Sequence, residues 1–368
     1  MLHNRLFKLR NRLLTNPGFR RWVQKTFIGQ WIANRQAYRL FRIASGFVHS
    51  QVLLACVRLD LFERLRHGPR TLTAIADELA LPADRSRHLL DAASALGLLE
   101  ARANGSYGLG MLGTAMTDNT PLTALVRHHA ALYEDLVDPV SMFASDGPSR
   151  RMAELWPYAT ADTPRSLDAD AVGAYTTLMA SSQSMIAEQV LNAVSLRRYR
   201  SLLDLGGGAG AFVAAVAERW PHLELTLADL PAVAEIARQR LDAKGMRERI
   251  GVIEVDAAKD TVSGTYDVVS LVRILHDHDD ERVLRLLATA RAALVPGGLL
   301  LVAEPLAGKR PPGDLIDAYF SIYLLAMGSG RPRRFEALSG LLEKAGFTRI
   351  RRRPTRVPLI TSVVVARR

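Results

Sequence analysis

One segment near the middle of the chain constrains its fold more than any other. Residues 201–210 read Ser-Leu-Leu-Asp-Leu-Gly-Gly-Gly-Ala-Gly, an apolar run that passes directly into a glycine cluster, and residues 212–219 have the pattern of a helix. Glycines at such a place let the backbone turn tightly and approach a ligand at the carboxyl end of a first strand. The segment predicts a parallel-sheet domain, and it also matches the dinucleotide fingerprint through Gly206, Gly208 and Ala211.

The strands expected after this turn end in polar residues. Apolar runs of strand length alternate with helical patterns after residue 200, which is typical of a mostly parallel sheet. The second run ends in Asp229, 23 positions after Gly206, where a carboxylate can accept hydrogen bonds from both hydroxyls of a ribose, as in NAD-binding proteins. The third ends in Asp256 and a later one in Glu304. We expect these ends at one rim of the sheet, after strands over 223–229, 250–255, 266–271 and 299–303.

The residues before this domain predict three helices and a hairpin. We expect an apolar helix over 51–66, a second helix capped by Thr71 or Thr73, and a third that opens at Pro82 and runs to Leu99. Asn104-Gly105 is the signature of a two-residue hairpin turn. This order of elements indicates a winged helix.

A winged helix raises the question of DNA binding. The helix that would enter the major groove spans residues 85–96, and its second half is apolar and carries Asp91, without Asn, Gln or Arg side chains to read base edges. We therefore expect this domain to form a homodimer, and we expect no nucleic-acid partner. A ligand-sensing winged-helix regulator stays open as an alternative, which salt-dependent binding to duplex DNA would support.

The basic charge of the chain lies in its first residues. The net charge is +11, residues 1–59 hold eleven Lys or Arg and no acidic residue, and the remaining residues hold 37 of each sign. Residues 1–42 also contain spaced leucine and aromatic residues, so we expect basic amphipathic helices broken near Asn16-Pro17-Gly18. Such helices suit peripheral contact with an anionic membrane surface, and they equally suit packing on a second subunit.

We expect neither a secretory signal nor a spanning helix. Basic residues interrupt every apolar run of the N-terminus. The longest promising uncharged stretch, residues 43–57, is partly polar and shorter than the about 20 residues that a spanning helix needs. The single cysteine, Cys56, fits a reducing compartment. The expected location is cytoplasmic, peripheral at the inner membrane if the N-terminal helices bind lipid.

Four motifs together resemble one enzyme class. They are Leu-Asp-Leu-Gly-Gly-Gly-Ala-Gly at 203–210, Ala-Asp-Leu-Pro at 228–231, Leu-His-Asp-His-Asp-Asp-Glu at 275–281 and Val-Pro-Gly-Gly at 295–298. The set resembles class I methyltransferases, and more narrowly the small-molecule O-methyltransferases that include plant caffeate and bacterial polyketide enzymes. The resemblance runs from about residue 45 to the end. It implies a Rossmann-like α/β methyltransferase domain behind an N-terminal helical winged-helix dimerisation domain, with S-adenosyl-L-methionine as the cofactor.

The resemblance also assigns residues to the cofactor. It implies that Asp229 holds the ribose, that Asp256 lies beside the adenine, and that Gly206 and Gly208 line the methionine part. Tyr175, Met179 and Gln183 match, more loosely, a family helix that covers the cofactor. The full set expected at the cofactor is Asp204, Gly206, Gly208, Asp229, Leu230, Asp256, Ala257, Arg273, Tyr175 and Met179.

Three residues of the resemblance concern catalysis. His276 matches the general base, while Asp277 and Glu304 match the acids that flank and orient it. A neutral imidazole within reach of a hydroxyl takes its proton as the C–O bond forms. The alternative is that His276 only caps or packs the helix expected from His278. We expect no metal, because alternating side chains over 276–280 would point to different faces of a helix and the family is metal-independent.

A narrower resemblance concerns the substrate. Residues 20–22, 47–62 and 317–327 resemble the carotenoid O-methyltransferases of purple photosynthetic bacteria, which methylate the tertiary 1-hydroxyl of acyclic carotenoids such as demethylspheroidene. The stretch 319–327 is aromatic and apolar, as a long polyene requires, although such stretches also form ordinary core. The expected reaction transfers the methyl group of S-adenosylmethionine to that hydroxyl.

Two other enzymatic functions stay open. One is methylation of another aromatic or polyketide hydroxyl. The other is an NAD-dependent oxidoreductase, which shares the glycine turn and Asp229 but leaves the segment 273–281 and Pro296-Gly297-Gly298 without a role. The expected domains are a basic arm (1–44), a winged-helix-like dimerisation domain (45–118), a helical connector (119–164) and an S-adenosylmethionine-binding domain (165–368).

Overall fold

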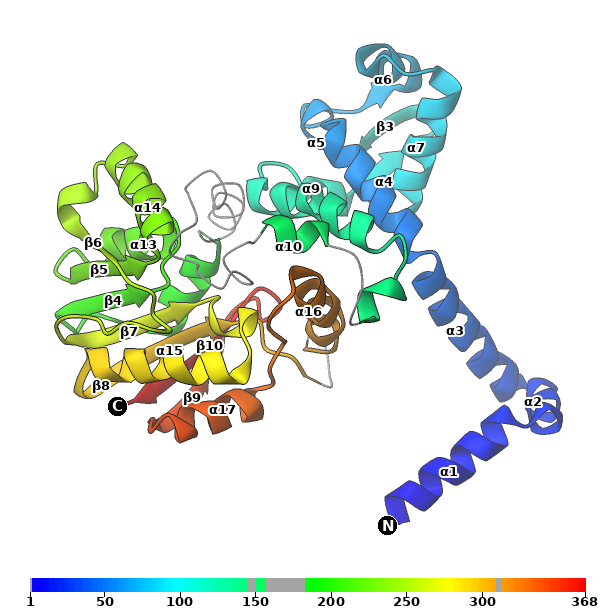
Figure 1. Ribbon diagram of the computed structural model, residues 1–368. Coiled ribbons are helices and arrows are strands. Elements are labelled where there is room, and N and C mark those ends of the chain that lie inside the picture. The colour runs from blue at the N-terminus through cyan, green and yellow to red at the C-terminus, as the bar shows by residue number, and fades with distance from the viewer. Residues whose placement is uncertain (1, 145–149, 156–182, 184, 309–312) are drawn as a thin grey trace. The chain divides into compact units, whose positions relative to one another are not determined.

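The chain folds into two compact units. The computed structural model describes residues 2–144, 150–155, 183, 185–308 and 313–368. One unit spans Met1–Asp118 and the other Asn119–Arg368. Figure 1 traces both, from blue at the N-terminus to red at the C-terminus.

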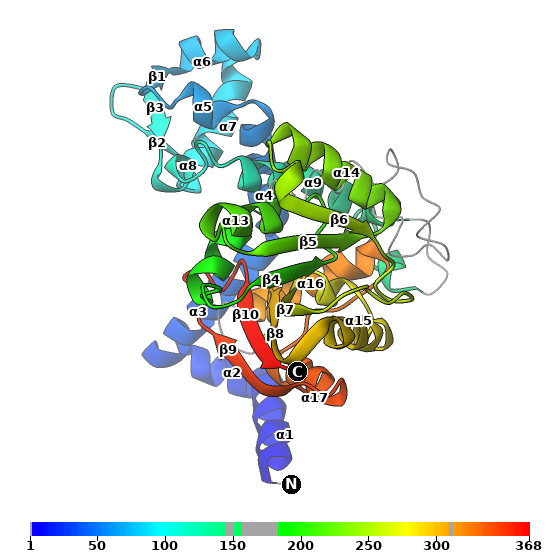
Figure 2. The same ribbon diagram turned by 90° about the vertical axis from the view of Figure 1, so that its left-hand side faces the viewer.

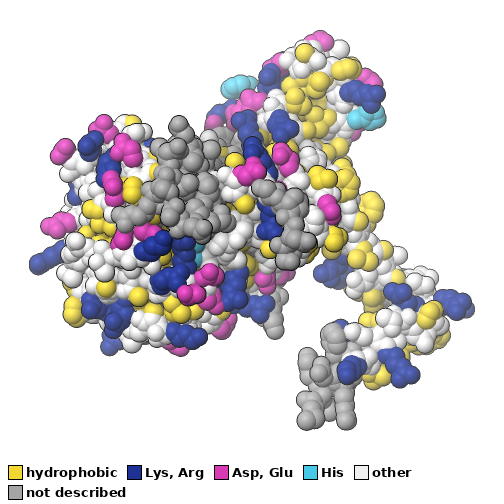
Figure 3. Space-filling model, viewed as in Figure 1, with side chains coloured by type: hydrophobic (Ala, Val, Ile, Leu, Met, Phe, Trp, Pro, Cys, Tyr) yellow, Lys and Arg dark blue, Asp and Glu magenta, His cyan; other side chains and the backbone are white. Residues whose placement is uncertain are grey.

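The first unit begins with three helices, α1 (Leu2–Thr15), α2 (Pro17–Gln24) and α3 (Phe27–Ala44). The break expected near Asn16 is confirmed, because its side chain accepts hydrogen bonds from the N–H groups of Gly18 and Phe19 and so caps α2. Thr26 caps α3 in the same way. In the view of Figure 3, hydrophobic and basic side chains lie side by side along these helices.

A spanning helix is not found among the residues that the structure describes. No single helix there is both long and apolar enough to cross a membrane. Helix α3 and the next helix, α4 (Gly46–Arg58), satisfy length and composition only as a pair, and the pair is bent by 48°.

The rest of the first unit is a winged helix. It contains helices α4, α5, α6 and α7 and a three-stranded antiparallel sheet of order β1-β3-β2, whose strand β1 precedes α6 while β2 and β3 follow α7. Thr71 is the residue that caps α6, through a bond from the Ala74 N–H. The elements are α5 (Leu61–Arg64), β1 (Arg70–Thr71), α6 (Leu72–Leu79), α7 (Ala83–Ala95), β2 (Leu99–Ala101), β3 (Ser106–Leu109) and α8 (Met111–Thr114).

Three local predictions in this unit are wrong. The helix expected over 51–66 is broken at Asp60, whose φ of 55° cannot continue a right-handed helix. The third helix ends at Ala95, since Gly97 adopts a φ of 72° and Leu99 already belongs to β2. The hairpin turn has three residues, because Arg102 pairs with Ser106 and a tight turn ends at Gly105 with a φ of 76°.

The second unit is built on a seven-stranded sheet of order β6-β5-β4-β7-β8-β10-β9. Strands β6, β5, β4, β7 and β8 are parallel to one another, while β10 runs antiparallel to both β8 and β9. The expected mostly parallel sheet is confirmed. The strands are β4 (Ser201–Leu205), β5 (Glu224–Asp229), β6 (Ile250–Glu254), β7 (Tyr266–Val272), β8 (Leu294–Glu304), β9 (Thr348–Arg353) and β10 (Ser362–Arg367).

Helices cover both faces of this sheet, as Figures 1 and 2 show. The helical residues 185–193, α13 (Ala211–Arg219) and α14 (Pro231–Ala243) form one apolar core with the sheet. On the opposite face, α15 (Asp280–Ala293) and α17 (Phe335–Lys344) form another. The continuous apolar strands therefore fit burial on both sides.

A smaller helical cluster completes the second unit. Helices α9 (Thr120–Asp135) and α10 (Arg151–Leu155) pack against α16 (Gly313–Met327) around the buried residues Met152 and Tyr323. The described part of the expected connector thus packs within the second unit. The short 3-10 helices η1 (Ser141–Phe143), η3 (Arg247–Arg249) and η4 (Leu275–Asp277) lie in loops.

Two boundaries in this unit differ from expectation. Helix α15 begins at Asp280 and not at His278, because the Asp279 side chain accepts a hydrogen bond from the Arg282 N–H and caps the helix. Pro296-Gly297-Gly298 lies within β8, where the register with β7 shifts between Tyr266 and Val268.

Replacing Phe212 with Ala should destabilise the second unit. Phe212 is among the largest fully buried side chains, so its loss leaves a cavity that costs about 3–5 kcal/mol in the free energy of unfolding. Urea unfolding followed by far-UV circular dichroism measures this. The matched control is Phe143→Ala, whose side chain is exposed and whose loss should change stability by less than about 0.5 kcal/mol. Equal effects of the two changes would contradict the assigned core.

Candidate functional site

The glycine turn after β4 has a backbone shape that favours glycine. Gly206 and Gly208 have φ angles of 71° and 56°, in the left-handed region. A Cβ on Gly206 would lie 2.7 Å from the Ile274 side chain, while a Cβ on Gly208 would meet no atom of the described residues within 4 Å. The backbone at Gly208 is therefore open to a ligand at the carboxyl end of β4.

Asp229 at the end of β5 faces this turn. Its carboxylate accepts hydrogen bonds from the Gly208 N–H and the Leu230 N–H, both at 2.8 Å. Part of its surface is accessible from the neighbouring cavity. The surrounding protein nevertheless raises the pKa of Asp229 to about 6 by burial, against the lowering effect of the two N–H donors.

A cavity runs along the carboxyl ends of β4, β5, β6 and β7. Asp256, after β6, contributes a carboxylate that is 2% exposed. Its Oδ2 has no hydrogen-bond partner among the described residues, although the Lys259 ammonium lies 3.8 Å away. Such an acceptor fits the exocyclic amine of an adenine. The expected residues that line the cavity are Gly206, Gly208, Asp229, Leu230, Asp256, Ala257 and Arg273, together with Gln183.

Three residues expected at the cofactor are not found on the wall of this cavity. Asp204 is not on the cavity wall: it is 1% exposed and accepts a hydrogen bond from Ser270 at 2.7 Å, beneath the glycine turn. Its expected direct contact with a cofactor does not match this position, and burial raises its pKa to about 7. Tyr175 and Met179 lie outside the residues that the structure describes.

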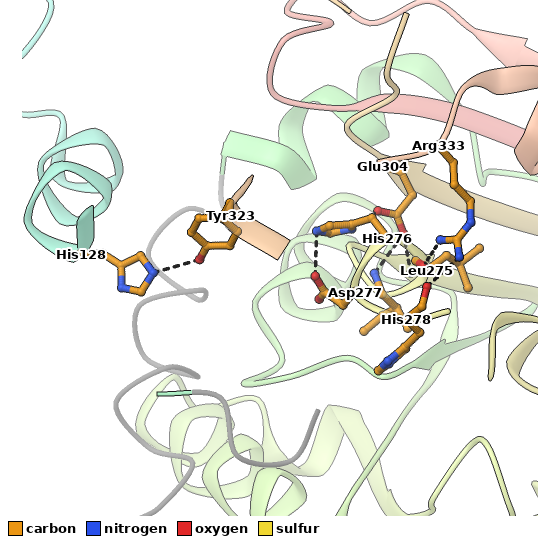
Figure 4. A network of polar contacts seen from close by, with 9 residues as sticks. His128, Leu275, His276, Asp277, His278, Glu304, Tyr323 and Arg333 are labelled. Atoms are coloured by element: carbon orange, nitrogen blue, oxygen red, sulfur yellow. Dashed lines mark hydrogen bonds and ion pairs between the residues drawn. The ribbon is translucent and has the colours of Figure 1, made fainter. Parts of the chain in front are cut away.

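Glu304 at the end of β8 organises the loop that follows β7. Its Oε1 accepts hydrogen bonds from the N–H groups of Ile274, at 3.0 Å, and Leu275, at 2.7 Å. Its Oε2 binds Nδ1 of His276. Figure 4 shows His276 between Glu304 and Asp277, whose Oδ1 lies 3.0 Å from Nε2. The three expected catalytic residues are therefore brought together.

The electrostatics of this group favour a proton on the imidazole. Burial alone would lower the pKa of His276, but the carboxylates of Asp277 and Glu304 outweigh it and the pKa is raised. Burial raises the pKa of Asp277 to about 6 in spite of the nearby imidazole. A proton shared between Nε2 and Asp277 is thus retained up to a higher pH than on an ordinary histidine.

A further residue holds this loop, and the sequence analysis missed it. Arg333 is 5% exposed and donates hydrogen bonds to the carbonyl oxygens of Leu275, at 2.5 Å, and His278, at 2.6 Å, and to the Asp280 carboxylate. Gly330 lies so close that a Cβ there would be 2.2 Å from the His276 carbonyl oxygen. In the sequence, Arg333 follows Gly328-Ser329-Gly330 among other arginines. This pattern does not by itself indicate a buried arginine that binds a loop.

The acidic residues after His276 have separate partners. Asp279 caps α15, and Asp280 pairs with Arg331 and Arg333. Within the ranges that the structure describes, no group of three or more His, Cys, Asp or Glu side chains is arranged to hold a metal ion.

A second, larger cavity lies beside α16. Its volume is about 510 Å³, within the range typical of small-molecule sites. The wall is mostly apolar and aromatic, and Phe320 packs edge-on against the His276 ring with centroids 5.6 Å apart. The expectation that residues 319–327 serve a substrate is consistent with this position: Tyr319, Phe320 and Tyr323 line the cavity, whereas Leu324 and Met327 belong to the core.

Two histidines of α9 pair with tyrosines of α16 at this cavity. The His129 ring bonds the Tyr319 hydroxyl at 2.7 Å, and the His128 ring bonds the Tyr323 hydroxyl at 2.9 Å, the latter visible in Figure 4. Burial lowers the pKa of both histidines, that of His128 to about 4, so both rings are neutral near pH 7. Their polar atoms therefore bind each other beside the apolar wall.

Arg273 lies between the two cavities and lines both. Its backbone has a φ of 58°, which is uncommon for a non-glycine residue, and its N–H donates to the Ala303 carbonyl oxygen. Arg273 thus connects the cavity of Asp229 and Asp256 to the apolar cavity that contains Phe320.

Comparisons with known protein families identify this arrangement. Residues 150–348 match the O-methyltransferase domain, and residues 41–119 match the O-methyltransferase dimerisation domain. The chain belongs to the S-adenosylmethionine-dependent O-methyltransferases. The expected fold, a Rossmann-like methyltransferase domain with an N-terminal helical dimerisation domain, is confirmed, and the matched families give no support to a regulator or an NAD-dependent oxidoreductase.

Individual members of this O-methyltransferase family are similar along most of the chain. Demethylspheroidene O-methyltransferase of Cereibacter sphaeroides is 40% identical over 335 residues, 91% of this chain and 88% of the relative. Acetylserotonin O-methyltransferase of Mus musculus is 30% identical over 340 residues, 87% and 86% of the two chains. The structure of human N-acetylserotonin methyltransferase in complex with S-adenosylmethionine matches with a TM-score of 0.72 at 27% identity, and it covers 90% of this chain and 98% of that one.

Replacing Asp229 with Ala should weaken binding of S-adenosylmethionine on the order of 100-fold, since two hydrogen bonds to a charged carboxylate are lost. Isothermal titration calorimetry measures the affinity. Asp242→Ala, an exposed carboxylate on α14, is the matched control and should bind normally. Unchanged affinity of Asp229→Ala would remove Asp229 from the site.

The same affinity should depend on pH. Because the pKa of Asp229 is raised to about 6, its carboxylate becomes protonated, and a weaker acceptor, as the pH falls through that value. Affinity for S-adenosylmethionine should be constant above pH 7 and decline below about 6. Asp229→Asn should bind weakly without this decline. A decline of equal size in Asp229→Asn would assign the titration to another group.

Proposed function

We propose that this protein transfers the methyl group of S-adenosylmethionine to a hydroxyl of a lipophilic acyclic carotenoid of the demethylspheroidene type. The observation that carries the proposal is the apolar cavity of about 510 Å³ in contact, through Phe320, with a histidine held between two carboxylates. Relatives at 40% identity are demethylspheroidene O-methyltransferases, which supports the substrate class.

The cofactor residues have distinct tasks in this proposal. Asp229 accepts hydrogen bonds from the ribose hydroxyls, and Oδ2 of Asp256 accepts one from the adenine amine. Gly206 and Gly208 leave room for the methionine part. Gln183 contributes a buried Oε1 to the same cavity, and this atom has no hydrogen-bond partner among the residues that the structure describes. When bound, S-adenosylmethionine supplies an electrophilic methyl group on a sulfonium.

His276 removes the proton of the substrate hydroxyl. Glu304 holds Nδ1 as a donor, so the neutral imidazole presents Nε2 as the acceptor. Asp277 lies 3.0 Å from that nitrogen and takes part of the positive charge that forms. With S-adenosylmethionine bound, the C–O bond would form as the methyl carbon–sulfur bond of the sulfonium breaks, leaving a neutral thioether. The hydroxyl proton would move to Nε2, and the carboxylates would stabilise the imidazolium.

The raised pKa of His276 suits an alcohol. A tertiary alkyl alcohol is far less acidic than a phenol, so a base of ordinary strength has little driving force. Two carboxylates in a buried position make the imidazole a stronger base than free histidine. Positioning and removal of water by the apolar cavity contribute the remainder, with proton loss late in the transition state.

The substrate class is tested by methyl transfer from labelled S-adenosylmethionine to a panel of compounds in liposomes. The panel contains acyclic 1-hydroxycarotenoids, the corresponding carotenoids without the hydroxyl, and simple phenols. Label only in the 1-hydroxycarotenoids is the expected result. Label in phenols alone would retain the methyltransferase and reject the carotenoid.

Replacing His276 with Ala should slow transfer by about 10²-fold or more and leave the affinity for S-adenosylmethionine unchanged. In the native enzyme, kcat should fall as the pH drops through a value above the usual pKa of histidine, because only the neutral ring accepts a proton. His222→Ala, an exposed histidine of the same unit, is the control. Full activity of His276→Ala would exclude it as the base.

We further propose that the chain acts as a homodimer and that residues 1–42 contact a membrane. The dimerisation-domain match supports the homodimer. Exposed aromatic residues support the membrane contact: Trp22, Phe27 and Trp31 are 64%, 85% and 57% exposed, beside cations such as Arg20 and Arg21. This arm would then lie peripherally at the surface in which the substrate is dissolved.

Changing Trp22, Phe27 and Trp31 together to Ser should lower partition into anionic vesicles by more than about tenfold, since three aromatic side chains lose their burial in lipid. Sedimentation with vesicles measures the partition. Serine at the exposed Val137, Val140 and Phe143 is the control. If the variant with three serines in the arm is monomeric in analytical ultracentrifugation and still binds vesicles, the arm packs on the second subunit.

A further inference from the structure

An open hollow of about 480 Å³ lies beside the edge strand β9, and five arginines surround it. Three come from alternate positions of that strand, Arg349, Arg351 and Arg353, and are exposed. The other two are Arg198, which follows the helical residues 185–193, and Arg367 at the end of β10. We call this hollow the arginine groove.

The strand register explains why Arg351 and Arg353 share one side. Arg351 and Arg353 pair with Val365 and Val363, whose side chains enter the core formed with the helical residues 185–193. Since alternate residues of a strand point to the same face, Arg351 and Arg353 extend that face beyond the edge of the core. Arg349 lies on the other side of the register shift in β9 and also lines the hollow. Ile350, between Arg349 and Arg351, packs against the opposite core.

Two of the arginines are held in place around Tyr199. Arg198 lies over the Tyr199 ring at 5.3 Å and Arg367 at 6.0 Å, and both donate hydrogen bonds to its hydroxyl. Among the described residues, no carboxylate lies within ion-pair distance of Arg349, Arg351 or Arg353, and the wall of the arginine groove contains neither Asp nor Glu. The positive charge is therefore available to an anion.

The arginine groove leads to the mouth of the apolar cavity. The loop after Arg353, residues 354–361, contains Val357 and Leu359, which are 39% and 50% exposed and also line that cavity. Leu315 of α16 does the same and is 62% exposed. Exposed apolar side chains at a cavity mouth thus continue, along one strand and its loop, into a row of cations.

We propose that this face of the second unit rests on an anionic lipid surface, with the arginine groove on the headgroup phosphates and the apolar mouth against the acyl chains. The proposal rests on the proposed function, because a carotenoid dissolved in lipid would enter the cavity directly at this mouth. Cations beside exposed apolar groups match the layers of a membrane surface. Nucleic acid satisfies only the cations and leaves the apolar mouth in water.

Protection of an edge strand does not explain the arginine groove. Charges on an exposed edge strand prevent pairing with other chains, and either sign serves that purpose. Here five charges of one sign converge from three segments, and two of them are ordered by Tyr199. Arg349 also has a φ of 52°, next to the register shift between Val365 and Arg367, which is backbone strain that a plain edge strand does not need.

The test uses the full chain with Arg349, Arg351 and Arg353 changed to Gln. Partition is measured by sedimentation with phosphatidylcholine vesicles that contain phosphatidylglycerol, and with phosphatidylcholine alone, at low and high salt. Each arginine near an anionic surface contributes about fivefold, so partition into the anionic vesicles should fall on the order of 100-fold at low salt. The matched control changes Lys244, Arg247 and Arg285, three exposed cations of the same unit, to Gln.

Both variants are also made with Arg20, Arg21 and Lys25 changed to Gln, so that binding by the arm does not hide the result. Equal partition of the triple variant and its control would overturn the proposal. The proposal would also be overturned if the unaltered chain bound RNA or DNA in a salt-dependent way and the triple variant lost this binding but still bound vesicles. Methyl transfer in detergent micelles tests the proposed function separately, and the triple variant should retain it. If the unaltered chain showed no methyl transfer in micelles, the proposed function would be refuted, but the measured partition into vesicles would still stand.

Discussion

The carboxylate of Glu304 is the contact on which the candidate active site depends. It lies at the end of β8, yet its oxygens bind two backbone N–H groups and the imidazole of the loop that follows β7. One side chain thereby sets the loop path, the orientation of His276 and the electrostatic environment that raises the pKa of that ring. Removal of this carboxylate would leave buried donors without partners, which is why loop geometry and chemistry are coupled here.

The sheet could be predicted from the sequence because its signals are local. An apolar strand, a glycine turn and a helix follow one another over residues 201–219, and β5 and β8 end in the acidic residues Asp229 and Glu304. The antiparallel strands β9 and β10 were not predicted. The boundaries that failed depend on single backbone angles: Asp60 adopts a left-handed conformation inside an apolar run that otherwise reads as one helix. Propensity and periodicity contain no information on such a residue, because tertiary contacts decide it.

The candidate site was predictable only in part, for a similar reason. Asp229, Asp256, His276 and Glu304 follow strands or belong to a motif, so their meeting at one rim follows from parallel topology. Arg333 and the two histidine–tyrosine pairs join α9, α16 and loops that are distant in sequence. Asp204 shows the opposite case, since it belongs to the glycine motif and yet lies beneath the turn, bound to Ser270. Motif membership indicates position along the chain but not the direction of a side chain.

The pairing of His128 and His129 with Tyr323 and Tyr319 has a consequence for how substrate range evolves. These rings satisfy each other beside the apolar wall, so they offer little to a polar molecule while the pairs are intact. Substitution of one histidine or tyrosine of a pair would leave the other ring with a hydrogen-bonding group free to bind a molecule in the cavity. Because α9 and α16 lie apart from the strand ends that contain Asp229 and Asp256, such a change leaves in place the residues proposed to hold the cofactor. If the proposed sites are correct, selection can therefore alter which hydroxyl compound is accepted without a change at the residues proposed for S-adenosylmethionine.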